Sequence, residues 1–265
     1  MKERPVIFNG EMVRAILDGR KTQTRRVMKV QPEYPELGLR HIVDSTNSDD
    51  IGKYFWSQSD ACGASKSRSK AFLCPFGQVG DRLWVRETFA TLGNEDGCAI
   101  DWNENLVKGG GQEAARIYRA SCEQKSGNYG LWSIPDIADW KPHTWNVQYE
   151  GSWVPSIHMP RWASRILLEI TAVRVERLND ISEEDAKAEG VRAIGNNFGN
   201  GPAYCDYLLP NWDDAAEWYN HASDSFKSLW KSIYGAENWR ANPWAWVIEF
   251  KRVRETICLS APAPK

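Results

Sequence analysis

The residues best suited to chemistry lie in one short block near the start of the chain, Gly19-x-Lys21-x-x-Thr24-x-Arg26. Thr24 and Arg26 are two residues apart, so their side chains share a face if the block is a β-strand. Lys21 falls in the turn before that strand, from which its amine can fold over the same face. A lysine partly removed from water beside Arg25 and Arg26 favours its neutral form, and a neutral amine can act as the base that activates the Thr24 hydroxyl. The spacing therefore predicts a nucleophilic site.

A second interpretation of the same block is electrostatic. The segment from Arg20 to Lys29 holds five basic residues and no acidic one, so it can bind phosphate without any catalysis. The whole chain carries 33 basic and 35 acidic residues, a net charge of −2, which excludes a polycation and makes any nucleic-acid contact local. The 14 tryptophans can stack on bases, or they can fill gaps in an irregular fold.

Three further residues are candidates for binding substrate. Glu87 follows Arg86 at the end of a predicted strand, where a carboxylate can accept a hydrogen bond from a cytosine amine; the alternative is a surface Arg-Glu pair. His158 and Arg161 flank a turn led by Pro160, whose unpaired amide groups attract anions; alternatively, the histidine ties down the turn.

The composition argues against metal and triad chemistry. The six cysteines, at positions 62, 74, 98, 122, 205 and 258, form no Cys-x-x-Cys pair and are expected to be thiols in a reducing compartment. The four histidines are accompanied by no Gly-x-Ser-x-Gly motif, which argues against a Ser-His-Asp hydrolase. We therefore expect no metal and no cofactor.

The elements that must position these residues can be read from hydrophobic spacing and capping residues. Helices are predicted after Asn9, after Asp180 or Ser182 up to Glu189, and from Ala222 to Gly235. A single helical turn is expected after Pro160. Strands are predicted over residues 6–8, from Thr24, and over 83–89, 115–118, 166–178 and 244–253.

Three polar stretches without a lasting period, 31–71, 91–154 and 191–221, are predicted to be insertions. The remaining core, 5–30, 72–90, 155–190 and 222–253, has the size of one domain. Its element order predicts a single α+β domain over residues 1–265, with a small curled sheet or barrel and flanking helices. A dinucleotide fold is excluded because no strand-helix alternation with a glycine-rich first turn is present.

Nothing in the sequence predicts a membrane partner. No apolar run approaches the roughly 18 residues of a spanning helix, and Met1-Lys2-Glu3-Arg4-Pro5 does not begin a secretory signal. We therefore expect a cytoplasmic protein.

Four motifs together resemble the ASCH domain family of the PUA-like superfamily, whose members are RNA-associated β-barrels. They are the Gly19 to Arg26 block after an amphipathic helix, Gly80-Asp81-x-Leu83-x-Val85, the helix 182–189, and Val247-Ile248-Glu249-Phe250. The whole chain, including residues 157–165, is similar to the long ASCH proteins carried by prophages of enteric bacteria. The resemblance implies a small PUA-like β-barrel with flanking helices.

The resemblance also implies a reaction. In the smallest ASCH enzymes, the N(4)-acetylcytidine amidohydrolases, a Lys, a Thr three residues later and a Glu on a later helix hydrolyse an amide. The matching residues here are Lys21, Thr24 and Glu189. Lys21 is then expected to help deprotonate Thr24, which attacks the amide, while Glu189 handles protons for the leaving amine and the incoming water. Arg25 and Arg26 are expected to bind substrate.

The alternatives remain open because this chain departs from the compact enzymes by its three insertions. It can be a non-catalytic binder of RNA, single-stranded nucleic acid or modified bases, since the same basic block can hold a phosphate or a base. Other relatives are linked to RNA cleavage, so a ribonuclease is a further alternative. A phage accessory protein would instead use the insertions to bind a protein partner.

Overall fold

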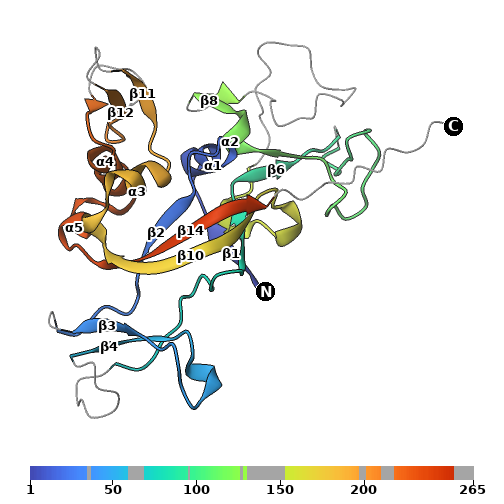
Figure 1. The fold of residues 1–265 in the computed structure, drawn as a ribbon. Helices are drawn as coiled ribbons and strands as arrows, with labels where there is room; N and C mark the ends of the chain where they lie inside the picture. Colours follow the sequence, from blue (N-terminus) through green and yellow to red (C-terminus); the bar gives the residue numbers. More distant parts are fainter. Residues whose placement is uncertain are drawn as a thin grey trace. The chain divides into compact units, whose positions relative to one another are not determined.

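The computed structural model describes residues 1–34, 37–58, 69–94, 96–125, 128–129, 153–196, 201–209 and 218–253. They form a mixed α+β structure with several sheets and few helices (Figure 1). The chain divides into two compact units. Unit 1 comprises Met1–Lys2, Ala15–Asp81 and Ile170–Phe250, and unit 2 comprises Glu3–Arg14, Arg82–Glu169 and Lys251–Lys265.

In unit 1 the candidate block of the sequence is an outer strand of a sheet. Strand β2 (Gln23–Val27) pairs antiparallel with β14 (Trp244–Val253), with Thr24 opposite Ile248 and Gln23 opposite Glu249. Strand β10 (Leu167–Arg177) is the next neighbour of β14, and its residues from Ile170 onward belong to unit 1. Because four of the five β14 residues opposite β2 are buried, this pairing fixes which β2 residues share each face.

Helices pack beside this sheet within unit 1. Helix α3 (Glu183–Ala188) contacts α4 (Ala222–Tyr234), which contacts α5 (Ala236–Arg240). A buried apolar cluster that contains the rings of Tyr204, Phe226 and Trp230 includes residues of α3 and α4. The smaller elements of the unit are the 3-10 turns η1 (Ser48–Asp50) and η4 (Leu178–Asp180), the hairpin β3 (Gly38–His41) and β4 (Tyr54–Ser57), and the sheet β11 (Ala193–Asn196), β12 (Pro202–Cys205) and β13 (Trp218–Tyr219).

Unit 2 is built on a parallel strand pair. Strand β1 (Glu3–Ile7) runs parallel to β5 (Arg82–Arg86), and the first residues of β10 pair antiparallel with β5. Helix α1 (Gly10–Leu17) begins in this unit, and its residues from Ala15 belong to unit 1. The remaining elements are β6 (Phe89–Thr91), β7 (Arg116–Tyr118), α2 (Arg119–Cys122), β8 (Glu123–Lys125), β9 (Asn128–Tyr129), η2 (Ser156–His158) and η3 (Arg161–Ala163).

Most predicted core elements are confirmed, including their caps. Asn9 accepts a hydrogen bond from the Met12 amide at 2.8 Å, and Ser182 accepts one from the Asp185 amide at 3.1 Å. The predicted strand at 115–118 is β7. The α+β class is therefore confirmed, whereas no sheet formed by the described residues is closed into a barrel.

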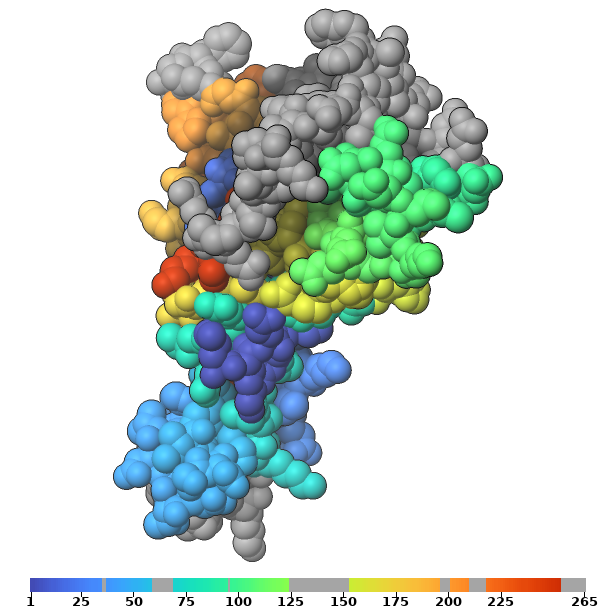
Figure 2. Space-filling model, turned by 90° about the vertical axis from the view of Figure 1, so that its right-hand side faces the viewer, coloured from blue at the N-terminus to red at the C-terminus, as the bar shows by residue number. Residues whose placement is uncertain are grey.

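The first predicted insertion contains more structure than its polarity indicated. Residues 31–71 include the β3–β4 hairpin, whose atoms form one light-blue group in Figure 2. Its Trp56 is only 1% exposed and lies 5.3 Å from the ring of Trp244, while Tyr54 lies edge-on to Trp246 at 5.0 Å. Strands of four residues are too short to show a hydrophobic period, so the sequence did not predict them. Aromatic packing on β14 holds them in place.

No helix among the described residues is long and apolar enough to cross a membrane.

Candidate functional site

The structure brings Lys21 and Glu189 into direct contact. The Lys21 Nζ donates to Glu189 Oε2 at 2.7 Å and to the Glu189 backbone oxygen at 2.8 Å. The Lys21 side chain is 0% exposed and that of Glu189 is 3% exposed. A fully buried ammonium is very costly unless it is paired, so this contact fixes both side chains.

Backbone hydrogen bonds bring these two distant segments together. Helix α1 ends at Leu17, and Gly19 follows it with a φ of 78°, the left-handed conformation that glycine adopts readily. The chain then turns back so that the Lys21 amide donates to the Ala15 backbone oxygen at 2.9 Å. The next amide, of Thr22, donates to Ala188 at 2.8 Å, at the end of α3. Lys21 therefore lies against the end of the helix that carries Glu189.

Gly190 makes this close approach possible. Its φ is 90°, and a Cβ atom there would lie 2.8 Å from Lys21 Cβ and 2.9 Å from Ala15 Cβ. Both distances are shorter than any ordinary contact between carbon atoms. The sequence indicated Gly190 only as the residue that ends the helix. The structure shows that Lys21 can approach Glu189 this closely because residue 190 has no side chain.

Burial lowers the pKa of the Lys21 amine from its usual range. The carboxylate of Glu189 opposes this shift, while the positive charges of Arg26 and Arg25 add to it. The pKa falls because the amine is completely removed from water and lies near two guanidinium groups. A lowered pKa increases the fraction of neutral amine that can accept a proton.

Arg25 is buried beside this pair and is held by carboxylates. Its NH2 donates to Glu176 Oε2 at 2.7 Å and to Asp185 Oδ2 at 2.9 Å, and its side chain is 0% exposed. Its NH1 lies 3.7 Å from Glu189 Oε1, beyond hydrogen-bond distance. Arg25, predicted to bind substrate, is therefore placed inside unit 1 next to Glu189.

Arg174 on β10 completes the charged network. It donates to Glu176 at 2.5 Å, to both oxygens of Asp185 at 2.8 and 2.7 Å, and to Gln23 at 3.1 Å, and it contacts Glu249. Burial opposes ionisation of Asp185, but the hydrogen bonds from Arg25 and Arg174 prevail and lower the pKa of its carboxyl group. Asp185 therefore stays ionised at neutral pH.

Thr24 lies on the other face of β2. Alternation puts Gln23 and Arg25 on one face and Thr24 with Arg26 on the opposite face, where Thr24 is 2% exposed beside Ile248. Among the described residues, no hydrogen bond joins the Thr24 hydroxyl to Lys21 or Glu189. Arg26 donates to the Tyr234 hydroxyl at 3.4 Å. Of the predicted trio, the structure thus brings Lys21 and Glu189 into contact and places Thr24 on the face of β2 opposite Arg25.

Glu87, in unit 2, forms a different kind of pair. Arg165 donates to its two oxygens at 2.9 Å each, and the guanidinium of Arg165 lies 4.0 Å from the Tyr118 ring centre. Glu87 is 2% exposed. The residue expected to pair with it, Arg86, instead donates to the Ser156 backbone oxygen at 3.0 Å.

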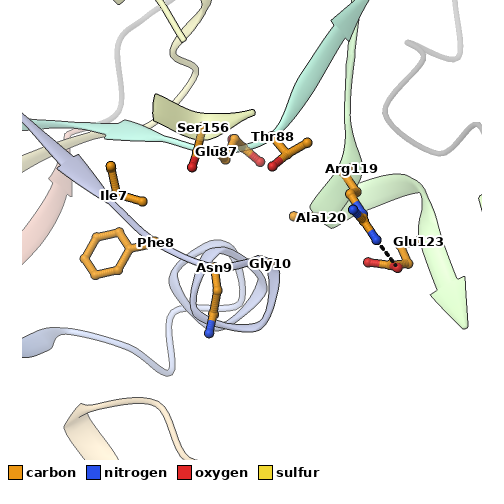
Figure 3. A pocket seen from close by; sticks show the side chains of 10 residues that line it. All are labelled: Ile7, Phe8, Asn9, Gly10, Glu87, Thr88, Arg119, Ala120, Glu123 and Ser156. Atoms are coloured by element: carbon orange, nitrogen blue, oxygen red, sulfur yellow. Dashed lines mark hydrogen bonds and ion pairs between the residues drawn. The ribbon is translucent and has the colours of Figure 1, made fainter. Parts of the chain in front are cut away.

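A pocket of ≈350 Å³ opens beside Glu87. Figure 3 shows Glu87, Thr88 and Ser156 along one side, the start of α1 on another, and the ion pair of Arg119 with Glu123 at 3.0 Å on a third. Its lining residues, which mix apolar and polar side chains, are Ile7, Phe8, Asn9, Gly10, Glu87, Thr88, Arg119, Ala120, Glu123 and Ser156.

The other two predicted binding residues lie on short turns of unit 2. His158 ends the turn η2 and is exposed. Arg161 begins η3, the turn predicted after Pro160, and its Nε donates to Glu3 at 2.8 Å. Neither His158 nor Arg161 lines the described pocket.

Within the part of the chain that the structure describes, no group of three or more His, Cys, Asp or Glu side chains is arranged to hold a metal ion.

Sequence reasoning missed the network around Arg25. Arg174 and Glu176 are two apart on a predicted strand and therefore share a face, which is the pattern that could have identified them. Asp185 was visible only as an acidic residue in the first turn of α3, a position usually explained by the helix dipole.

Comparisons with protein-family models, with curated proteins and with solved structures find no match for this chain.

Proposed function

We propose that this protein is an ASCH-like hydrolase that removes an acyl group from the N(4) amide of a cytidine, free or within RNA. The observation that carries the proposal is the buried Lys21–Glu189 contact, formed between residues 168 positions apart in the sequence. A buried lysine with a lowered pKa beside a carboxylate is a combination that functional sites use for proton transfer.

The proposed reaction has two stages. The Thr24 oxygen attacks the amide carbonyl as its proton passes to the Lys21 amine, and the carbon-nitrogen bond then breaks. The Glu189 carboxylate takes that proton from the Lys21 ammonium and passes it to the leaving N(4) amine, which leaves the acyl group as an ester on Thr24. Water deprotonated by Glu189 hydrolyses that ester, and the returning proton restores the threonine hydroxyl. The first step requires the Thr24 hydroxyl to approach the Lys21 amine.

The test is hydrolysis of N(4)-acetylcytidine, followed by chromatographic separation of cytidine. Thr24→Val removes the nucleophile while keeping the side-chain shape, and Glu189→Gln removes the proton-transfer group. Each is expected to lower kcat by at least about 100-fold. A wild-type protein that releases no cytidine would contradict the proposal.

Two exposed neighbours provide matched controls. Thr22→Val makes the same change two residues earlier, and Glu184→Gln makes it on an exposed residue of α3. Both are expected to keep wild-type kcat, because neither side chain is buried with Lys21. If the controls lose activity equally, the effects report folding rather than catalysis.

The pocket in unit 2 favours a second candidate function, non-catalytic binding of a nucleobase or nucleoside. Its volume falls in the range of small-molecule sites, and its wall includes Glu87, a carboxylate that can accept from an exocyclic amine.

Equilibrium dialysis with cytidine and N(4)-acetylcytidine separates the two candidates. If the pocket binds the base, Glu87→Gln is expected to weaken binding by about 10-fold or more, whereas Lys21→Met leaves it unchanged. Loss of hydrolysis in Lys21→Met with retained binding would assign catalysis to unit 1 and recognition to unit 2. Binding of RNA would show a salt dependence that Arg26→Ala reduces.

The family assignment is part of the same proposal. The Gly19 to Arg26 block, the helix ending in Glu189-Gly190 and the strand 247–250 support an ASCH-like chain of the prophage type, with a PUA-like barrel as its complete fold. Among the described residues, Cys74, Cys98, Cys122 and Cys205 are thiols that form no disulfide bond, which supports a reducing, cytoplasmic location.

A further inference from the structure

We propose that Arg25 is a positioning residue that acts through Glu189. It holds the carboxylate so that Oε2 stays on the Lys21 amine, while Oε1 is the oxygen that exchanges a proton with the reacting group. This inference rests on the proposed amide hydrolysis.

The first support is the way in which Arg25 is held. Its NH2 is fixed by Glu176 and Asp185, and Asp185 is in turn fixed by Arg174 through two short hydrogen bonds. An exposed arginine that binds substrate would not be enclosed by two carboxylates. A guanidinium held in this way can instead orient the carboxylate beside it, which belongs to Glu189.

The second support is that the two oxygens of Glu189 differ in their hydrogen bonds. Oε2 accepts from Lys21 at 2.7 Å, whereas Oε1 is buried without a hydrogen-bond partner among the described residues. Arg25 NH1 and Nε are also buried without such a partner, and NH1 lies 3.7 Å from Oε1. Arg25 NH1 and Glu189 Oε1 thus form an ion pair without a hydrogen bond, so the guanidinium holds Oε1 in place while this oxygen keeps its capacity to bond to a reacting group.

The charges around Lys21 give the sign of the expected effect. Arg25 disfavours the charged amine, so a neutral residue at position 25 raises the pKa of Lys21 and reduces the neutral amine available at pH 7. A lysine at position 25 keeps the positive charge but loses the planar fork that orients Glu189. The charged groups around the Lys21 amine come from four elements. They are Asp185 in α3 and Glu189 directly after it, Arg25 and Arg26 from β2, Glu176 and Arg174 from β10, and Glu249 from β14.

The experiment measures kcat, KM and the pH profile of hydrolysis in Arg25→Lys and Arg25→Gln. Both variants are expected to lower kcat by about 100-fold while changing KM less than about 3-fold, because a misplaced proton-transfer group affects the chemical step. Only Arg25→Gln is expected to move the acidic limb of the profile toward higher pH. The matched control, Arg240→Gln, makes the same substitution at an exposed residue of α5 and is expected to match the wild type.

A measurement without substrate separates this inference from the proposed function. The Lys21 pKa is followed by NMR of ¹³C-labelled lysine in the wild type and in Arg25→Lys and Arg25→Gln. A higher Lys21 pKa in Arg25→Gln but not in Arg25→Lys shows that the charge of Arg25 acts on the Lys21–Glu189 pair even if the wild type hydrolyses nothing, in which case only the reaction is wrong. An unchanged Lys21 pKa in Arg25→Gln, or a raised KM with normal kcat in both variants, overturns the inference.

Discussion

Each unit contains one buried carboxylate paired with a cation, but the two pairs differ in what they can do. In unit 2, Arg165 occupies both oxygens of Glu87, and an arginine does not release its proton. In unit 1, Lys21 occupies one oxygen of Glu189, and burial lowers the pKa of its amine. The first pair is a fixed structural contact that also lines a pocket, whereas the second retains a titratable base and a carboxylate oxygen without a hydrogen bond among the described residues.

The largest expected effect comes from breaking the unit 1 pair. Lys21→Met leaves the Glu189 carboxylate buried without its partner and is expected to lower the free energy of unfolding by about 3–5 kcal/mol. The double variant Lys21→Met/Glu189→Met is expected to recover most of this loss, because an apolar pair removes both charges. Urea unfolding measures both. A single variant as stable as the wild type would show that the pair is not buried in solution.

Gly190→Ala is the next test. The added methyl group meets Lys21 and Ala15 at a backbone angle that disfavours alanine, so we expect a loss of about 2–4 kcal/mol. Gly19→Ala has a similar positive φ but open space around the new methyl group, so it should lose only about 1 kcal/mol. The difference between the two unfolding free energies measures the close approach, and equal losses would contradict it.

A smaller effect is expected in unit 2 from Arg165→Lys. Lysine keeps the charge but cannot donate to both Glu87 oxygens or stack on Tyr118 in the same way. We expect a loss of about 1–2 kcal/mol in urea unfolding. A loss as large as that of Lys21→Met would remove the distinction between a partly solvated pair and a fully buried one.

The smallest effect is the pH dependence of stability. The pKa of Lys21 is lowered in the folded protein, so above that lowered pKa the unfolded chain binds a proton that the folded chain does not. Stability therefore rises with pH up to the unfolded value near 10.4, by at most about 1.4 kcal/mol per pH unit. Subtracting the curve of Lys21→Met/Glu189→Met isolates this contribution, and a flat difference would contradict it.

The sequence predicted the framework of the site well because local signals specify it. The cap at Ser182, the stop at Gly190 and the strand from Thr24 all follow from residue types at fixed spacing, and all are confirmed. The pairing of Lys21 with Glu189 was anticipated from family resemblance. It could not be obtained from spacing, since nothing local relates residues so far apart.

The rest of the site depends on tertiary pairing. Alternation on β2 was applied to Thr24 and Arg26 but not to Gln23 and Arg25, whose face is defined by contacts with β10 and α3. A basic residue in a sequence is equally compatible with solvent and with a buried carboxylate partner, and only the fold distinguishes them. The pocket beside Glu87 likewise joins four segments that no local pattern connects.

The most direct test of the account is the titration of Lys21 itself in the wild-type protein. The ¹³C resonance of its side chain, assigned by comparison with Lys21→Met, is followed from pH 6 to pH 11. The account predicts a pKa below the ordinary lysine value of about 10.4, which makes a neutral amine available to a substrate. A pKa at or above that value would mean that Lys21 is a permanently charged partner of Glu189, and the pair would then be as purely structural as Glu87 with Arg165.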